Sequence, residues 1–276
     1  MKKILFVFIF TTIFVAFAFS AHSFTKAEQE AVDKMMLFRL ETALLTSEET
    51  ITAVDKYTKE FLAEAAEKHY SEEAILTIEN YLVIEKFSSF DEINPNHPEM
   101  EPLLKAQNEK NDKWFKAHEK EEKTSWFYCS YAGIISNYLR YQSLFSKMEK
   151  GLLVKDYLDI ALKQDPKMSV AQVGIAMWLF YAPAISGGSV NKALDYFEQA
   201  VVNARNNSEL FYAVFYKTQC LFHKGKKNEY KTAMDELKKI IPANRKVELL
   251  EKLNAAGYTI FDYQDNRAKI QKKLGI

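Results

Sequence analysis

The sequence has few of the residues that interrupt regular structure. Its 276 residues include only eight glycines and six prolines. It also has no Asn-Gly dipeptide, which is the strongest short signal for a β-hairpin. Long helices joined by short connections have this composition. We therefore expect an all-α fold, in a chain long enough to bury a sizeable core.

An excess of charge of either sign is also lacking. The chain has 37 basic and 37 acidic residues, and losing a leader that contains Lys2 and Lys3 would leave 35 basic residues against 37 acidic ones. Binding to nucleic acid or to an anionic membrane surface usually requires a basic patch. The composition therefore argues against nucleic acid as a partner.

Motifs of catalysis and metal binding are missing too. There is no Gly-x-Ser-x-Gly, no glycine-rich loop ending in Lys-Ser/Thr and no Cys-x-x-Cys. His97 and His118 lie beside carboxylates but lack the i, i+4 histidine pairing of a helical zinc site. Gly187-Gly188 before a helix start could bind an anion, although a flexible joint is the commoner role. We expect no enzyme, no cofactor and no metal.

Only two cysteines occur, Cys129 and Cys220. In an exported protein a pair usually indicates a disulfide. In a regular stack of helix pairs, however, their helices would lie two repeats apart, roughly 20 Å at the usual interhelical spacing. A disulfide needs Cα atoms within about 7 Å, so we expect both thiols to be free and buried.

Residues 1–23 resemble a secretory signal peptide. A short basic start precedes residues 4–19, which are apolar except for two threonines. Ser20 or Ser23 would satisfy the small-x-small rule for cleavage. The alternative is an uncleaved anchor, since about 16 apolar residues are slightly short for a full span. No cysteine lies near the site, so we expect an exported protein, periplasmic or secreted, that is not a lipoprotein.

Periodic apolar positions predict helices along the rest of the chain. Residues 24–90 form an N-terminal helical region of three helices, and 91–102 is a proline-rich connection. Residues 103–276 form a helical repeat domain. Its predicted helices cover 102–118, 124–147, 151–164, 168–182, 189–205, 207–224, 226–241, 243–256 and 259–273. The aromatic-rich helix 124–147 is expected to be buried on several sides.

The turn at 183–189 shows how these helices are joined. Pro183 and the pair Gly187-Gly188 end the preceding helix, and Ser189 fits the N-cap of the next. Ala193, Phe197 and Ala200 then share one apolar face, with the same spacing as Val154, Leu158 and Ala161 39 residues earlier, and as Tyr230, Met234 and Leu237 37 residues later. A fixed period of 34 to 40 residues indicates a helical solenoid.

These residues carry a family resemblance. Residues 161–167 (Ala-Leu-Lys-Gln-Asp-Pro-Lys) and 192–200 resemble second helices of tetratricopeptide repeats, most clearly over 150–245. The chain is similar to exported bacterial proteins of this type, including the T component of tripartite ATP-independent periplasmic transporters. The resemblance implies a right-handed solenoid of helix pairs with a concave binding groove.

Aromatic residues are candidates for lining that groove. The five that we single out are Trp126, Trp178, Tyr181, Tyr212 and Tyr216. Any one of them could instead belong to the core between repeats. We expect at least one or two of the seven aromatic residues on helices 168–182 and 207–224 to be exposed, namely Trp178, Phe180, Tyr181, Phe211, Tyr212, Phe215 and Tyr216.

Two functions are compatible with the sequence. The first is a non-enzymatic scaffold or accessory binding subunit, which would bind a periplasmic solute-binding protein or another envelope protein through the groove. The alternative is a periplasmic carrier of a small apolar ligand, held in a tunnel between the repeats and the N-terminal helices and lined by Trp126, Trp178 and Tyr181. Neither requires stable membrane insertion once the signal is removed.

Overall fold

The computed structural model describes residues 22–242 and 244–275, and over these residues the protein is all-α, with no strand. The predicted all-α class is therefore confirmed. The predicted signal peptide and Ser20 lie outside the described residues, whereas Ser23 is exposed. The helices are α1 (Lys26–Thr42), α2 (Ser47–Lys68), α3 (Glu72–Ile93), α4 (Met100–Ala117), α5 (Ser125–Tyr138), α6 (Leu144–Gln164), α7 (Ser169–Tyr181), α8 (Val190–Asn203), α9 (Asn207–His223), α10 (Lys227–Ile240), α11 (Arg245–Ala255), α12 (Ile260–Asp265) and α13 (Arg267–Leu274).

Side-chain caps define where the first helices begin. Thr25 and Thr46 each form a capping box with the glutamate three residues later, and Ser71 caps α3. The Glu28 carboxylate of the first box also accepts a hydrogen bond of 2.7 Å from the backbone N–H of Ser71. The start of α1 is thereby bonded to the start of α3.

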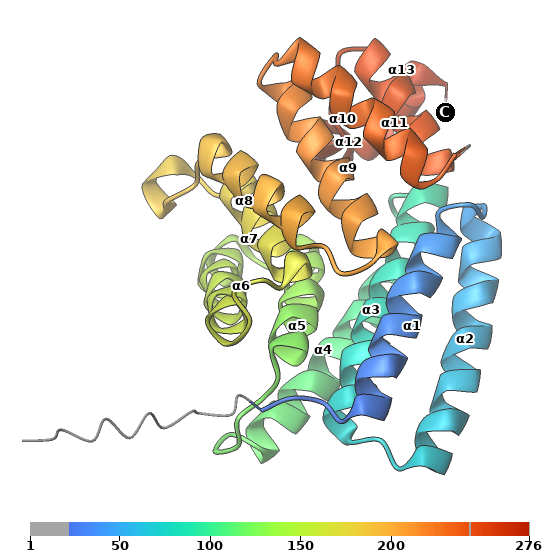
Figure 1. Cartoon of the computed structure of the whole chain (residues 1–276), viewed down its shortest axis with the longest axis vertical. Coiled ribbons are helices and arrows are strands. Elements are labelled where there is room, and N and C mark those ends of the chain that lie inside the picture. The colour runs from blue at the N-terminus through green and yellow to red at the C-terminus, as the bar shows by residue number, and fades with distance from the viewer. Residues whose placement is uncertain (1–21, 243, 276) are drawn as a thin grey trace, which may run out of the picture.

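The first helix lies between two parts of the molecule that are far apart in sequence (Figure 1). α1 packs against α3 on one side and against α9 on the other. From α5 onward, consecutive helices pack on one another as far as α10. The contact between α1 and α9 brings the N-terminal helices against the C-terminal half of the chain, so the helices do not form a simple extended row.

The aromatic-rich segment 124–147 is not one helix. α5 ends at Tyr138, a 3₁₀ turn follows over Leu139–Tyr141, and α6 begins at Leu144. Ser143 is the N-cap of α6, since its hydroxyl accepts a hydrogen bond from the backbone N–H of Ser146. The prediction of one helix over 124–147 that is buried on several sides is therefore wrong, and Phe145 in α6 is 79% exposed. A Ser cap inside an apolar run was the overlooked signal.

The last predicted helix is also divided, into α12 and α13. Thr259 and Asp262 form a capping box at the start of α12, and the chain bends at Asn266 before α13. Short polar side chains that bond their own backbone compete with a continuous helix.

The connection between α7 and α8 contains a 3₁₀ turn, Ala184–Ser186, after Pro183. Gly187 has φ of 93°, a left-handed conformation that favours glycine. A Cβ at Gly188 would lie 1.7 Å from the carbonyl oxygen of Ala182. Ser189 is the N-cap of α8, as its position in the sequence indicates.

Cys129 in α5 and Cys220 in α9 are both free and buried. Burial raises the pKa of the Cys129 thiol to about 12 and that of the Cys220 thiol to about 11. Both thiols are therefore protonated at neutral pH. They are unreactive, because the thiolate is the reactive form.

Two alanine substitutions test the glycine geometry. Gly188→Ala is expected to lower the free energy of unfolding by more than about 1 kcal/mol, because the added methyl group meets backbone. Gly151→Ala, inside α6 where a Cβ meets nothing within 4 Å, should raise it by about 0.5–1 kcal/mol. Urea denaturation of both variants measures the difference, and equal effects would contradict this account of the turn.

Candidate functional site

The five aromatic residues singled out from the sequence have different neighbours in the structure. Trp126 is buried and packs edge-on against Tyr81 of α3. The indole N–H of Trp178 donates to the carbonyl oxygen of Gly151 in α6, at 2.8 Å. Tyr181 and Tyr216 both lie near the ring of Phe261 in α12, with centroids 5.9 and 6.2 Å away.

Tyr181 is the most exposed of the five, at 41%. Its hydroxyl lies 3.0 Å from Oε1 of Gln264. The expected exposure of one or two aromatic residues therefore falls on Tyr181 at the end of α7. The structure brings Tyr181 and Tyr216 together on Phe261, but it places Trp126 and Trp178 against other helices.

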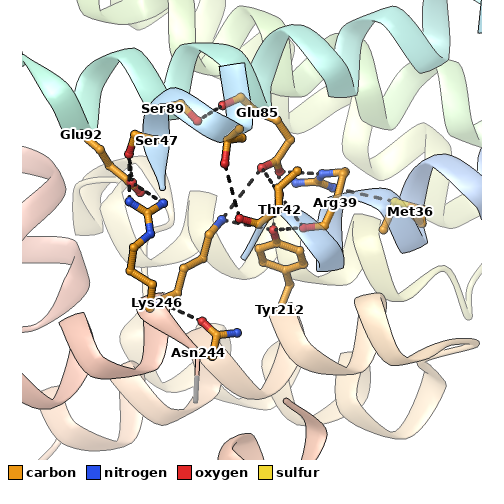
Figure 2. Close-up of polar contacts among 12 residues, drawn as sticks. Met36, Arg39, Thr42, Ser47, Glu85, Ser89, Glu92, Tyr212, Asn244 and Lys246 are labelled. Atoms are coloured by element: carbon orange, nitrogen blue, oxygen red, sulfur yellow. Dashed lines mark hydrogen bonds and ion pairs between the residues drawn. The ribbon is translucent and has the colours of Figure 1, made fainter. Parts of the chain in front are cut away.

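Tyr212, the fifth residue, belongs to a polar junction between α1, α3, α9 and α11 (Figure 2). Its hydroxyl donates to the carbonyl oxygen of Arg39, at 3.3 Å. At the centre of the junction, Nε of Arg39 donates to Glu85 at 2.7 Å, and Nζ of Lys246 lies 3.9 Å from the same carboxylate. The Arg39 guanidinium also lies over the Tyr212 ring, 4.9 Å from its centroid.

The Glu85 side chain is only 5% exposed, so its charge depends on these neighbours. Burial by itself would raise the pKa of the Glu85 carboxyl, but the positive charges of Lys246 and Arg39 outweigh burial and lower it. In the same way, Glu85 raises the pKa of Arg39 against the effect of burial. All three groups are therefore charged at neutral pH.

A second group of charges continues the junction. Asp91 at the end of α3 pairs with Arg140, at 2.6 Å, and with Arg267 of α13, at 2.8 Å. Glu92 next to it accepts hydrogen bonds from Ser47 at 2.8 Å and pairs with Arg245 at 3.0 Å. The C-terminal turn of α3 is thus bonded to α2, α11 and α13.

At the centre of the junction, two cations, Arg39 and Lys246, share the single carboxylate of Glu85. In the described part of the chain, no group of three or more His, Cys, Asp or Glu side chains is placed to hold a metal ion. His97 stacks on Phe90 and His118 on Trp114, so both rings pack against aromatic side chains. None of the described helices is long and apolar enough to cross a membrane.

The exposed candidate site is on α6. Four large apolar residues there point into solvent: Leu144, Phe145, Met148 and Leu152 are 77%, 79%, 69% and 54% exposed. Leu144, Met148 and Leu152 are spaced at i, i+4 and i+8, and Phe145 adjoins them, so they form one face of the helix. We call this face the α6 stripe. Apolar patches of this kind usually mark an interaction surface.

The surroundings of the α6 stripe carry both signs of charge. From the helical spacing, Lys147 lies on one flank and Glu149 on the other, and both are exposed. Leu158 packs on Gly174 and Gly151 accepts from Trp178, so α6 and α7 run in opposite directions. The end of α7, followed by Ile185, which is 97% exposed, therefore lies at the same end of the pair as the stripe.

No protein-family model matches the chain, and a search of curated proteins finds no match either.

Sequence reasoning missed both the junction and the α6 stripe. Arg39 and Tyr212 are 173 residues apart, and no local pattern connects them. The stripe was hidden because its residues have the spacing of a core-facing helix, and exposure depends on what packs nearby. The Ser143 cap was the available signal that a separate helix begins there.

Removing the charge of Glu85 tests the junction. Glu85→Gln should lower the free energy of unfolding by about 3 kcal/mol at pH 7, because it leaves Arg39 and Lys246 uncompensated. The control is Asp159→Asn, which removes the exposed i, i+4 partner of Lys155. It should lower the free energy of unfolding by about 0.5 kcal/mol or less.

The stability difference between wild type and Glu85→Gln should depend on pH. The folded-state pKa of Glu85 is below its ordinary value of 4.5, so its stabilising charge is present above that pH and lost as the pH falls through the folded pKa. The difference between wild type and Glu85→Gln should therefore shrink below pH 4.5 in thermal melts. A difference that stays constant down to pH 3 would contradict the assignment.

Glu209 in α9 should show the opposite pH dependence, because its pKa is raised whereas that of Glu85 is lowered. It is 4% exposed, and burial raises its pKa above 4.5 although its carboxylate accepts from the N–H of Arg205 at 2.9 Å. The wild type loses stability as the pH rises through that folded pKa. Glu209→Gln should therefore gain stability relative to wild type between pH 4 and pH 7, whereas exposed Glu229→Gln should not. Thermal melts across that range measure it.

Proposed function

We propose that the protein is a non-enzymatic binding protein that docks a helix of a protein partner on the α6 stripe. The observation that carries the proposal is the exposure of Leu144, Phe145, Met148 and Leu152 on one helical face. Burying large apolar side chains of this kind contributes about 1.5–3 kcal/mol each. The stripe is about 12 Å long at 1.5 Å per residue, which suits two to three turns of a partner helix.

Charge favours a protein over a lipid surface as the partner. Lys147 and Glu149 flank the α6 stripe with opposite signs, whereas helices that lie on anionic membranes are usually rich in lysine and arginine. A partner helix with apolar side chains at i and i+4 and charges on its flanks fits this surface. The docking surface proposed here is a face of α6, and the sequence led us to expect a concave groove instead. The class of function, protein binding, is the same.

We also propose that the fold is a solenoid of tetratricopeptide type and that the protein is exported. Burial at the recurring positions supports repeats of tetratricopeptide type: Leu158, Phe197 and Met234 are all at most 5% exposed. Export is supported by the apolar run and cleavage positions of residues 1–23. A partner in the cell envelope follows from export.

Site-specific cross-linking tests the docking surface. With a photoreactive residue in place of Met148, the protein in its own cell envelope should form one discrete protein adduct. The cross-linked peptide of that adduct should map to an amphipathic helix of the partner. A photoreactive residue at Lys163, exposed at the far end of the same helix, is the control and should not give that adduct.

Variants of the stripe complete the test. Phe145→Ser and Leu152→Ser should reduce the adduct at position 148 at least ten-fold while changing the unfolding free energy by no more than about 0.5 kcal/mol, since both side chains are exposed. Val202→Ser, at an apolar residue that is 83% exposed on α8, is the matched control and should leave the adduct unchanged. Equal adducts from positions 148 and 163, or binding of the purified protein to vesicles with 30% phosphatidylglycerol that Phe145→Ser abolishes, would overturn the proposal.

A further inference from the structure

A cleft opens at the edge of the polar junction, where the N-terminal helices meet the C-terminal ones. Its volume is about 200 Å³. It is lined by residues of α2, α3, α11, α12 and α13, namely Ser47, Glu92, Arg245, Lys246, Leu249, Lys252, Tyr263 and Gln271.

The charge of this lining is unbalanced. Three cations, Arg245, Lys246 and Lys252, face one carboxylate, Glu92. Glu92 is already engaged by Ser47 and Arg245. The carboxylate behind Lys246, Glu85, is shared with Arg39, which lies closer to it than Lys246 does. The cleft therefore keeps an excess of positive charge after these pairs are formed.

One acid outside the lining interacts with Arg245. Glu49 is exposed at the start of α2, and its carboxylate accepts a hydrogen bond of 2.8 Å from the backbone N–H of Thr46. Its pKa is lowered by these bonds to Thr46, with a smaller effect from Arg245. Glu49 is not among the residues that line the cleft.

Hydrogen-bond donors remain free at the cleft. Nε of Arg245 is buried and has no hydrogen-bond partner in the described protein. Lys252 forms no ion pair within 4.0 Å among the described residues, and it is an exposed residue of the cleft lining. α2 begins at Ser47 and α11 at Arg245, so the positive ends of two helix dipoles add to the same field. Buried donors of this kind are usually satisfied by water or by a ligand.

We propose that this cleft binds a small oxyanion of the phosphate class, through Arg245, Lys246 and Lys252. The volume of about 200 Å³ accommodates one phosphate group with a few waters. All three cations belong to α11, whereas α2 and α3 contribute Ser47 and Glu92 to the lining. The proposal is independent of partner binding on the α6 stripe.

Inorganic phosphate is the probe. Titrated into the full mature chain at pH 7.5, it should raise the Tm in a saturable way and beyond the effect of NaCl at the same ionic strength, because a ligand that binds only the folded state stabilises it by mass action. Isothermal calorimetry at 15 °C should give one site per chain.

Lysine variants identify the site. Lys252→Gln should raise the Kd for phosphate about five-fold, because it removes one exposed charge and leaves the Glu92–Arg245 pair intact. Lys231→Gln, at an exposed lysine on α10, should leave the Kd unchanged. The inference is overturned if phosphate acts no more strongly than NaCl, or if the two variants bind phosphate alike.

Discussion

One buried carboxylate, Glu85, joins α1 to α11. Glu85 of α3 pairs with Arg39 of α1 and lies within ion-pair distance of Lys246 of α11. Removing a charge from water is costly, and a buried ion pair is stable only if its remaining donors and acceptors are also bonded. The hydroxyls of Thr42 and Tyr212 lie 3.4 and 3.5 Å from the carboxylate oxygens. The helices cannot separate here without exposing charges that have lost their partners.

The position of this junction explains much of the architecture around it. α1 packs on both α3 and α9, and the charged side chains at the end of α3 extend the contact to α2, α11 and α13. Interior charges of this kind add less to net stability than apolar packing would, but they penalise every arrangement in which they are unpaired. We infer that the junction selects one way of closing the N-terminal helices onto the C-terminal half.

The two proposed binding surfaces have different origins. The cleft exists because α2, α3 and α11 to α13 meet at the junction and bring more cations than carboxylates to its edge. The α6 stripe is apolar like the core, yet no described helix covers it. One surface is suited to a small charged ligand and the other to an apolar helix, and the two lie on different elements.

The sequence by itself determined the helical class and most helix boundaries, because periodicity, glycine scarcity and N-caps such as Ser189 act over a few residues. It also indicated that Leu158 and Phe197 face the core, and both residues are buried. Only the tertiary structure decided that Phe145 is exposed, that Tyr212 lies in a polar junction and that Lys246 lies next to Glu85. These outcomes depend on which distant helices meet. Burial and charge pairing are properties of the whole packing, and a local pattern of apolar and charged residues does not contain them.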